Sequence, residues 1–142
     1  MSADDIAARI AALMLEREGT GPAWGIEIEE AREGYARLRM RLRADMLNAY
    51  AMAHGGMIFA LADTAFAYAC NSRNERAVAA QASIVFLDAA REGEMLVAEA
   101  REQASVGRSG VYAVKVTGGD GRVIAEFQGL SRTIGGEVLT QG

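Results

Sequence analysis

One short segment of this 142-residue sequence contains residues whose types and spacing could carry chemistry, namely Asn48, His54, Gly55, Gly56 and Asp63. The apolar residues after His54 predict a helix that begins there. A helix N-terminus offers backbone N–H groups without acceptors and a partial positive charge. Glycines let a ligand approach these groups because they carry no Cβ. An ester or thioester oxygen would be polarised there as in an oxyanion hole. Alternatively, Gly55 and Gly56 only permit a tight turn into the helix.

Asp63 lies inside this apolar helix, flanked by Ala62 and Thr64. Burial raises the pKa of a carboxyl group unless a cation or a hydrogen-bond donor offsets the lost solvation. We therefore expect Asp63 either to act chemically or to pair with an arginine or a backbone group. His54 is a candidate general base, a donor to a carbonyl or a packing residue at the helix start.

Composition narrows the possible functions. The sequence has one histidine and one cysteine, Cys70, which excludes an intrachain disulfide and a multi-histidine zinc centre. Cys70 lies at the far end of the predicted helix and is expected to be a buried, inert thiol. A Gly-x-Ser-x-Gly elbow and a phosphate-binding loop are both absent from the sequence. Composition leaves open a mixed metal site with a single histidine.

Charge and hydropathy argue against nucleic-acid and membrane partners. Fifteen basic residues stand against nineteen acidic residues, for a net charge of −4. A surface that coats nucleic acid is therefore not expected. The first nine residues lack the apolar run of a secretory signal. Residues 44–71 are long enough to span a bilayer, but Asp63 near their middle would cost about 2.5–3.5 kcal/mol there. We expect a cytoplasmic protein.

The remaining pattern predicts the elements that position these residues. Helical spacing predicts an N-terminal helix over about residues 2–18, ended by Gly19, Gly21 and Pro22. Strict alternation of apolar residues and arginines over residues 35–43 predicts a half-buried strand, with the arginines on a solvated face. Further strands are expected at residues 24–31, 77–87, 94–106, 110–117 and 122–133, with glycine-rich turns at 107–110 and 118–121.

A helix over residues 55–71 that is apolar on all sides must be enclosed. A single antiparallel sheet can enclose it only by curling around it, which is the α+β hotdog fold, a sheet wrapped around a long central helix. We therefore predict one domain over residues 1–142, with a core of about residues 24–136. Such a sheet leaves one face and one edge to cover, so a symmetric dimer or larger oligomer is expected.

The stretch from Asn48 to Asn71 resembles the PaaI-type thioesterases of phenylacetic acid degradation. The resemblance covers about residues 24–136 and includes Gly110-Val111-Tyr112 and Thr133-Ile134-Gly135-Gly136. It implies a hotdog-fold acyl-CoA thioesterase, usually a tetramer of two dimers, that hydrolyses (hydroxy)phenylacetyl-CoA and related aryl-acyl-CoA thioesters. CoA belongs to the substrate, so no cofactor is implied.

The same resemblance implies roles for individual residues. Asp63 matches the catalytic carboxylate, as a nucleophile or as a general base for water. Gly55 matches the residue whose N–H binds the thioester oxygen. His54 and Asn48 match residues that hydrogen-bond the carbonyl or position the attacking group. Substrate contacts are expected from Gly56, Thr64, Phe66, Arg108 and Ser109.

Two of these substrate assignments have specific alternatives. Arg108 and Ser109 fall where related enzymes meet the CoA phosphates, but they could equally form an ordinary hairpin tip. The central helix offers Met57, Phe59, Phe66 and Tyr68 as candidate walls for an aromatic acyl group.

Helix geometry adds an expectation about assembly. Gly55 and Asp63 are separated by about 12 Å along a helix, too far to act on one thioester. We therefore expect each active site to be shared between two chains. Two other functions stay open: an acyl-CoA-binding module without turnover, and a hotdog dehydratase or hydratase. The last fits less well, because His54 precedes Asp63 by nine residues, whereas in those enzymes the acid comes first at closer spacing.

Overall fold

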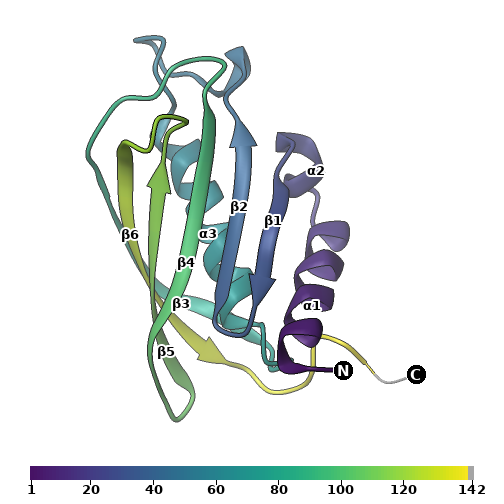
Figure 1. Cartoon of the computed structure of the whole chain (residues 1–142). Helices are drawn as coiled ribbons and strands as arrows, with labels where there is room; N and C mark the ends of the chain where they lie inside the picture. The colour runs from purple at the N-terminus through teal and green to yellow at the C-terminus, as the bar shows by residue number, and fades with distance from the viewer. Residues whose placement is uncertain (141–142) are drawn as a thin grey trace.

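A curved antiparallel sheet of six strands packs against one long helix, α3, in the computed structural model, which describes residues 1–140 (Figure 1). The strands follow the order β1-β2-β4-β5-β6-β3 across the sheet. Their bounds are β1 Glu27–Arg32, β2 Tyr35–Arg41, β3 Ala77–Phe86, β4 Met95–Val106, β5 Ser109–Thr117 and β6 Val123–Thr133. The predicted hotdog architecture is confirmed.

The helices are α1 Ala3–Arg17, α2 Thr20–Trp24 and α3 Gly55–Cys70, with one 3-10 turn at Ala44–Met46. The predicted start of α1 is confirmed, because Ser2 and Asp5 form a reciprocal capping box. The prediction for the next segment was wrong. A short helix, α2, occupies it, and β1 begins at Glu27 rather than at residue 24. Pro22 is tolerated in the first turn of that helix, and Gly25 ends it at φ +67°.

The side of α3 that faces the sheet forms the centre of the core. It contributes Ile58, Leu61, Ala62, Ala65, Phe66, Tyr68 and Ala69, all of them buried. The opposite side is less covered. Gly56 is exposed there, and Ala60, Asp63, Ala67 and Cys70 are only half-buried. The chain alone therefore does not complete the enclosure expected for this helix.

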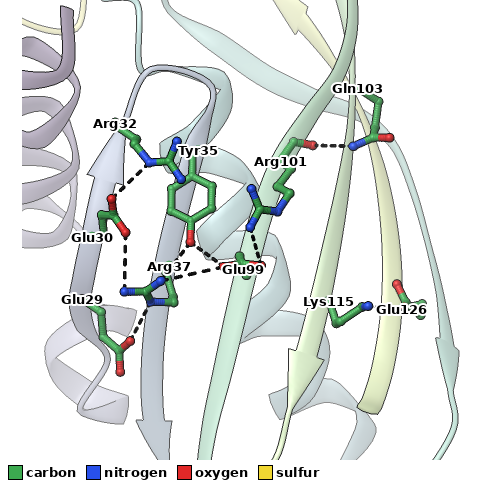
Figure 2. A network of polar contacts seen from close by, with 10 residues as sticks. All are labelled: Glu29, Glu30, Arg32, Tyr35, Arg37, Glu99, Arg101, Gln103, Lys115 and Glu126. Atoms are coloured by element: carbon green, nitrogen blue, oxygen red, sulfur yellow. Dashed lines mark hydrogen bonds and ion pairs between the residues drawn. The ribbon is translucent and has the colours of Figure 1, made fainter. Parts of the chain in front are cut away.

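The alternation predicted along β2 is confirmed. Ala36, Leu38 and Met40 are fully buried toward α3, whereas Arg37 and Arg39 lie on the outer face. Carboxylates neutralise these arginines. Figure 2 shows the Arg37 guanidinium between Glu29 at 2.8 Å, Glu30 at 3.5 Å and Glu99 at 3.9 Å. The outer face is thus an internally paired surface rather than a free cationic patch.

The two edges of the sheet differ. Helix α1 packs against β1 and covers that edge. Strand β3 pairs only with β6, and Val78, Val85 and Phe86 along it are exposed. A long exposed apolar edge strand is a ready template for pairing with another strand. Among residues 1–140, no helix is long and apolar enough to cross a membrane.

Candidate active site at the start of helix α3

Helix α3 begins at Gly55 because His54 caps it. The His54 Nδ1 atom accepts a hydrogen bond of 2.9 Å from the Gly56 N–H, and the extended backbone of His54 ends the preceding loop. This bond uses the N–H of the second glycine. The Gly55 N–H has no acceptor among residues 1–140. Of the two glycines proposed to face a ligand, Gly55 is therefore the one with a donor to offer.

Asn48 supplies a second donor from the loop before the helix. Its Oδ1 atom accepts hydrogen bonds from the backbone N–H groups of Tyr50, at 2.9 Å, and Met52, at 3.2 Å. Two backbone donors fix the amide orientation, so the Nδ2 group must point the other way. Within the described chain this Nδ2 group has no acceptor. The same asparagine thus shapes the loop and keeps an N–H group available.

Asn48 and Gly55 line one cavity of about 420 Å³. Its walls come from the loop before α3, the first turn of α3 and the segment that follows β3. The other lining residues are Met52, Ala53, Ile58, Phe86, Leu87, Asp88, Ala89 and Ala90. A cavity lined by two residues that each have an N–H group without an acceptor is suited to binding a carbonyl group and polarising its oxygen.

Asp63 lies two turns further along α3, outside this cavity. Its carboxylate is half-buried and makes no hydrogen bond or ion pair within residues 1–140. Burial raises the pKa of Asp63 above its usual range, and the negative charge of Glu18 raises it further. The structural alternative, a carboxylate paired with an arginine, is not what the described chain shows. A carboxylate whose pKa is raised is a stronger base than a free carboxylate.

Glu18 is a residue that sequence reasoning missed. It lies at the C-terminus of α1, where its carboxylate accepts a hydrogen bond from the hydroxyl of Tyr68 on α3. The two residues are fifty positions apart, and Glu18 lies outside the stretch that carries the family resemblance, so no sequence signal links it to Tyr68. Helix α1 thereby places a negative charge near the catalytic candidate.

Several residues expected to contact substrate are buried in the described chain. Phe66 is 1% exposed and packs against Tyr112 and Phe127, with ring centroids 5.5 and 5.8 Å away. Tyr68 is equally buried, and Thr64 is 8% exposed, with its hydroxyl donating to the Ala60 carbonyl at 2.7 Å. In the described chain, Phe66 and Tyr68 have almost no surface to offer a ligand. Phe86, which the sequence did not single out, has that surface.

Met57 and Phe59 remain half-buried near the start of α3. Phe59 packs edge-on against Phe127, with ring centroids 5.4 Å apart. Their assignment as walls for an acyl group stays a prediction.

Arg108 and Ser109 lie far from Gly55, beyond the other end of α3. They line a second cavity, of about 410 Å³, that also contains Cys70, Arg73 and Ser131. The Arg108 guanidinium donates two hydrogen bonds to the Thr133 carbonyl, at 3.1 and 2.7 Å. This arrangement places the side chain at the cavity while tying it to β6. A phosphate contact and an ordinary hairpin tip both remain possible roles.

The Cys70 thiol behaves as a packing group. Burial raises its pKa to about 12, and the nearby Asp63 charge adds to the shift. A thiol with such a pKa is protonated at physiological pH and is a poor nucleophile. Among residues 1–140, no group of three or more histidine, cysteine or acidic side chains is arranged to hold a metal ion.

Comparisons with known proteins place the chain in a family. The family model of the thioesterase superfamily matches residues 50–125, which include Gly55, Asp63 and Phe86. The acyl-coenzyme A thioesterase PaaI of Escherichia coli is 40% identical over 125 residues, which are 88% of this chain and 89% of that protein.

Solved structures extend the likeness to three dimensions. The structure of the Escherichia coli PaaI protein from the phenylacetic acid degradation operon matches with a TM-score of 0.94 at 39% identity, covering 96% of this chain and 99% of the other. A hypothetical thioesterase protein from Streptococcus pneumoniae, solved with coenzyme A, matches with a TM-score of 0.76 at 26% identity over 79% of this chain and 88% of the other. The chain belongs to the thioesterase superfamily.

Proposed function

We propose that the protein hydrolyses acyl-CoA thioesters, with phenylacetyl-CoA and its hydroxylated derivatives as preferred substrates, to the free acid and CoA. One observation carries the reaction type: Gly55 and Asn48, each with an N–H group that has no acceptor in the described chain, line the same cavity. The preference for aryl-acetyl groups draws on the Escherichia coli relative, an acyl-CoA thioesterase whose structure is described as part of the phenylacetic acid degradation operon.

The thioester carbonyl oxygen accepts hydrogen bonds from Gly55 and Asn48, and the partial positive charge at the start of α3 adds to its polarisation. Asp63 takes a proton from a water molecule whose oxygen attacks the carbonyl carbon. The tetrahedral intermediate collapses by breaking the carbon–sulfur bond, and the departing thiolate takes up the proton. In the alternative route, the Asp63 carboxylate attacks the carbonyl and the carbon–sulfur bond breaks to release the thiolate. Water then hydrolyses the resulting anhydride and supplies the proton that the thiolate takes up. Both routes yield the acid and CoA without a cofactor.

The proposal requires two chains at each active site. Gly55 and Asp63 of one chain are about 12 Å apart along α3, whereas the reacting groups must lie about 3–3.5 Å from the thioester. An antiparallel α3 from a second chain, packed on the half-buried side of α3, brings the partner's carboxylate to the Gly55 cavity. The exposed edge of β3 gives a homodimer its second contact. A tetramer built from two such dimers completes the proposed assembly.

A reducing cytoplasmic location fits the single free thiol at Cys70. The Arg108 and Ser109 cavity is the proposed place for the CoA phosphates, since a guanidinium and a hydroxyl there can both donate to phosphate oxygens.

Steady-state hydrolysis of a panel of acyl-CoA thioesters, followed by released thiol, tests the proposal. Phenylacetyl-CoA and hydroxyphenylacetyl-CoA are expected to give the highest kcat/KM, ahead of acetyl-, hexanoyl- and palmitoyl-CoA. Palmitoyl-CoA as the best substrate would contradict the aryl preference. Tight binding of every ester without turnover would identify a binding module instead of an enzyme.

A further inference from the structure

Two large apolar side chains are open to solvent beside the cavity that contains Asn48 and Gly55. Phe86 is 52% exposed and Leu87 is 57% exposed. Both line this cavity. Apolar surface of this size next to polar donors is typical of a ligand-binding site.

The geometry of β3 places the Phe86 side chain on the face of the sheet that contacts α3. Phe86 pairs with the fully buried Ala125 on β6, whereas its neighbour Val85 pairs with the exposed Glu126. Successive residues of a strand point to opposite faces, so Phe86 faces α3 and Val85 faces outward. A Cβ on Gly55 would lie 3.0 Å from the Phe86 Cζ atom. The tip of the ring therefore touches the backbone of the residue whose N–H is free.

Backbone hydrogen bonds hold the segment after Phe86 in place, while the Phe86 ring itself is only partly covered. The Leu87 N–H donates to the Ile124 carbonyl at 2.8 Å, and the Ala53 N–H donates to the Ala90 carbonyl at 2.8 Å. The carboxylate in the lining, Asp88, forms an ion pair of 3.1 Å with Arg122. The interior of the cavity thus favours an uncharged apolar group next to Gly55.

We propose that Phe86 determines acyl-group specificity by packing against the aromatic ring of an aryl-acetyl thioester whose carbonyl oxygen is bound at Gly55. This inference rests on the proposed thioesterase function. In an aryl-acetyl group, one methylene separates the ring from the carbonyl carbon, so the ring must lie close to the oxyanion position. Phe86 is the aromatic residue that touches that position. Aromatic pairs gain from offset or edge-on packing at centroid distances of about 4.5–7 Å, which a straight acyl chain cannot reproduce.

The test compares kcat/KM for phenylacetyl-CoA with kcat/KM for hexanoyl-CoA in four proteins: the parent, Phe86→Ala, Phe86→Leu and Val85→Ala. Phe86→Ala is expected to lower the phenylacetyl-to-hexanoyl ratio by about tenfold, the effect of one lost apolar contact in a pocket. Phe86→Leu keeps apolar volume without the ring and is expected to lower the ratio by less. Val85→Ala truncates an equally exposed residue of the same strand on the opposite face, so its ratio is expected to match the parent.

Both substrates are measured on the same preparation. Incomplete assembly of a variant therefore lowers both kcat/KM values by the same factor and leaves their ratio unchanged. Size-exclusion chromatography with light scattering shows whether each variant keeps the parent assembly. An unchanged ratio in active Phe86→Ala enzyme would overturn the inference. An unchanged ratio means that kcat/KM changes equally for both substrates, so the ring would then contact the shared CoA arm or only support the fold. A parent enzyme that hydrolyses no CoA thioester would instead refute the proposed function.

Discussion

Gly55 and Asp63 lie on one continuous helix, α3, separated by eight positions, and Gly55 lines a cavity that Asp63 does not line. At 1.5 Å per residue the separation is about 12 Å, so the two groups of one chain cannot act on one thioester. His54→Ala removes the cap that holds the start of α3 beside the carbonyl-binding position, so it is expected to be inactive, as is Asp63→Asn. Mixing these two variants should therefore restore activity. Half of randomly mixed dimers contain both variants, and half of their sites are intact, which gives about a quarter of the parent rate.

Native mass spectrometry must show that the subunits exchange, because activity can be restored only in mixed dimers. Exchange without any recovery of activity would place each active site within one chain. Mixing Asp63→Asn with itself under the same conditions is the matched control, because no intact site can form.

Replacing Asp63 with asparagine should abolish turnover while leaving substrate binding. Asparagine has nearly the same shape but can neither attack the carbonyl nor accept a proton, so the rate should fall about a hundredfold to ten-thousandfold. Stopped assays and equilibrium binding of phenylacetyl-CoA measure the two effects separately. A variant with more than about a tenth of the parent rate would remove Asp63 from the catalytic role.

The same substitution should raise Tm at alkaline pH. The folded-state pKa of Asp63 is raised by burial and by Glu18, so its charged form destabilises the folded protein. This penalty is present above the folded-state pKa and vanishes below the unfolded value, near pH 3.8. At about pH 8 the Tm of Asp63→Asn should thus be higher than that of the parent. The difference in Tm should decrease toward zero as the pH is lowered to about 4.

Substituting Glu18 with glutamine should shift the acid limb of the pH–rate profile. The substitution removes a negative charge near Asp63 but keeps an oxygen acceptor for Tyr68. The pKa of Asp63 should fall, so kcat/KM should hold to a lower pH than in the parent. Glu16→Gln, an exposed residue of the same helix, is the control and should leave the profile in place. Identical profiles for Glu18→Gln and the parent would mean that Glu18 only anchors α1.

Periodicity was sufficient to predict the sheet, the central helix and the start of the site. The alternation along β2 predicts a half-buried strand, because such a strand has a period of two residues. The apolar pattern on all sides of α3 predicts an enclosed helix, because such a helix has no polar stripe. His54 and Gly55 were placed at the start of α3 because a helix N-terminus has a local sequence signature. These features depend on neighbours in the chain.

The features that sequence missed depend on distant contacts. Phe66 and Phe86 are both phenylalanines in apolar segments, but one meets Tyr112 in the core and the other lies half-exposed over Gly55. Composition cannot distinguish them, because the packing of α3 on the sheet buries Phe66, whereas the register of β3 on β6 sets the position of Phe86. The hydrogen bond between Glu18 and Tyr68 joins segments fifty residues apart for the same reason.

Gly129 offers a test of how tightly the sheet packs on α3. A Cβ at this position would lie 2.8 Å from three atoms of the Phe66 ring, and that ring is held between Tyr112 and Phe127. The ring cannot move aside, so Gly129→Ala should destabilise the fold by about 1–3 kcal/mol, as other overpacked cores do. For a chain of this length that corresponds to a fall in Tm of about 2–4 °C per kcal/mol. Gly119→Ala, where a Cβ would meet nothing within 4 Å, is the control and should leave Tm close to the parent. Equal Tm values for both variants would show that Phe66 has room to shift.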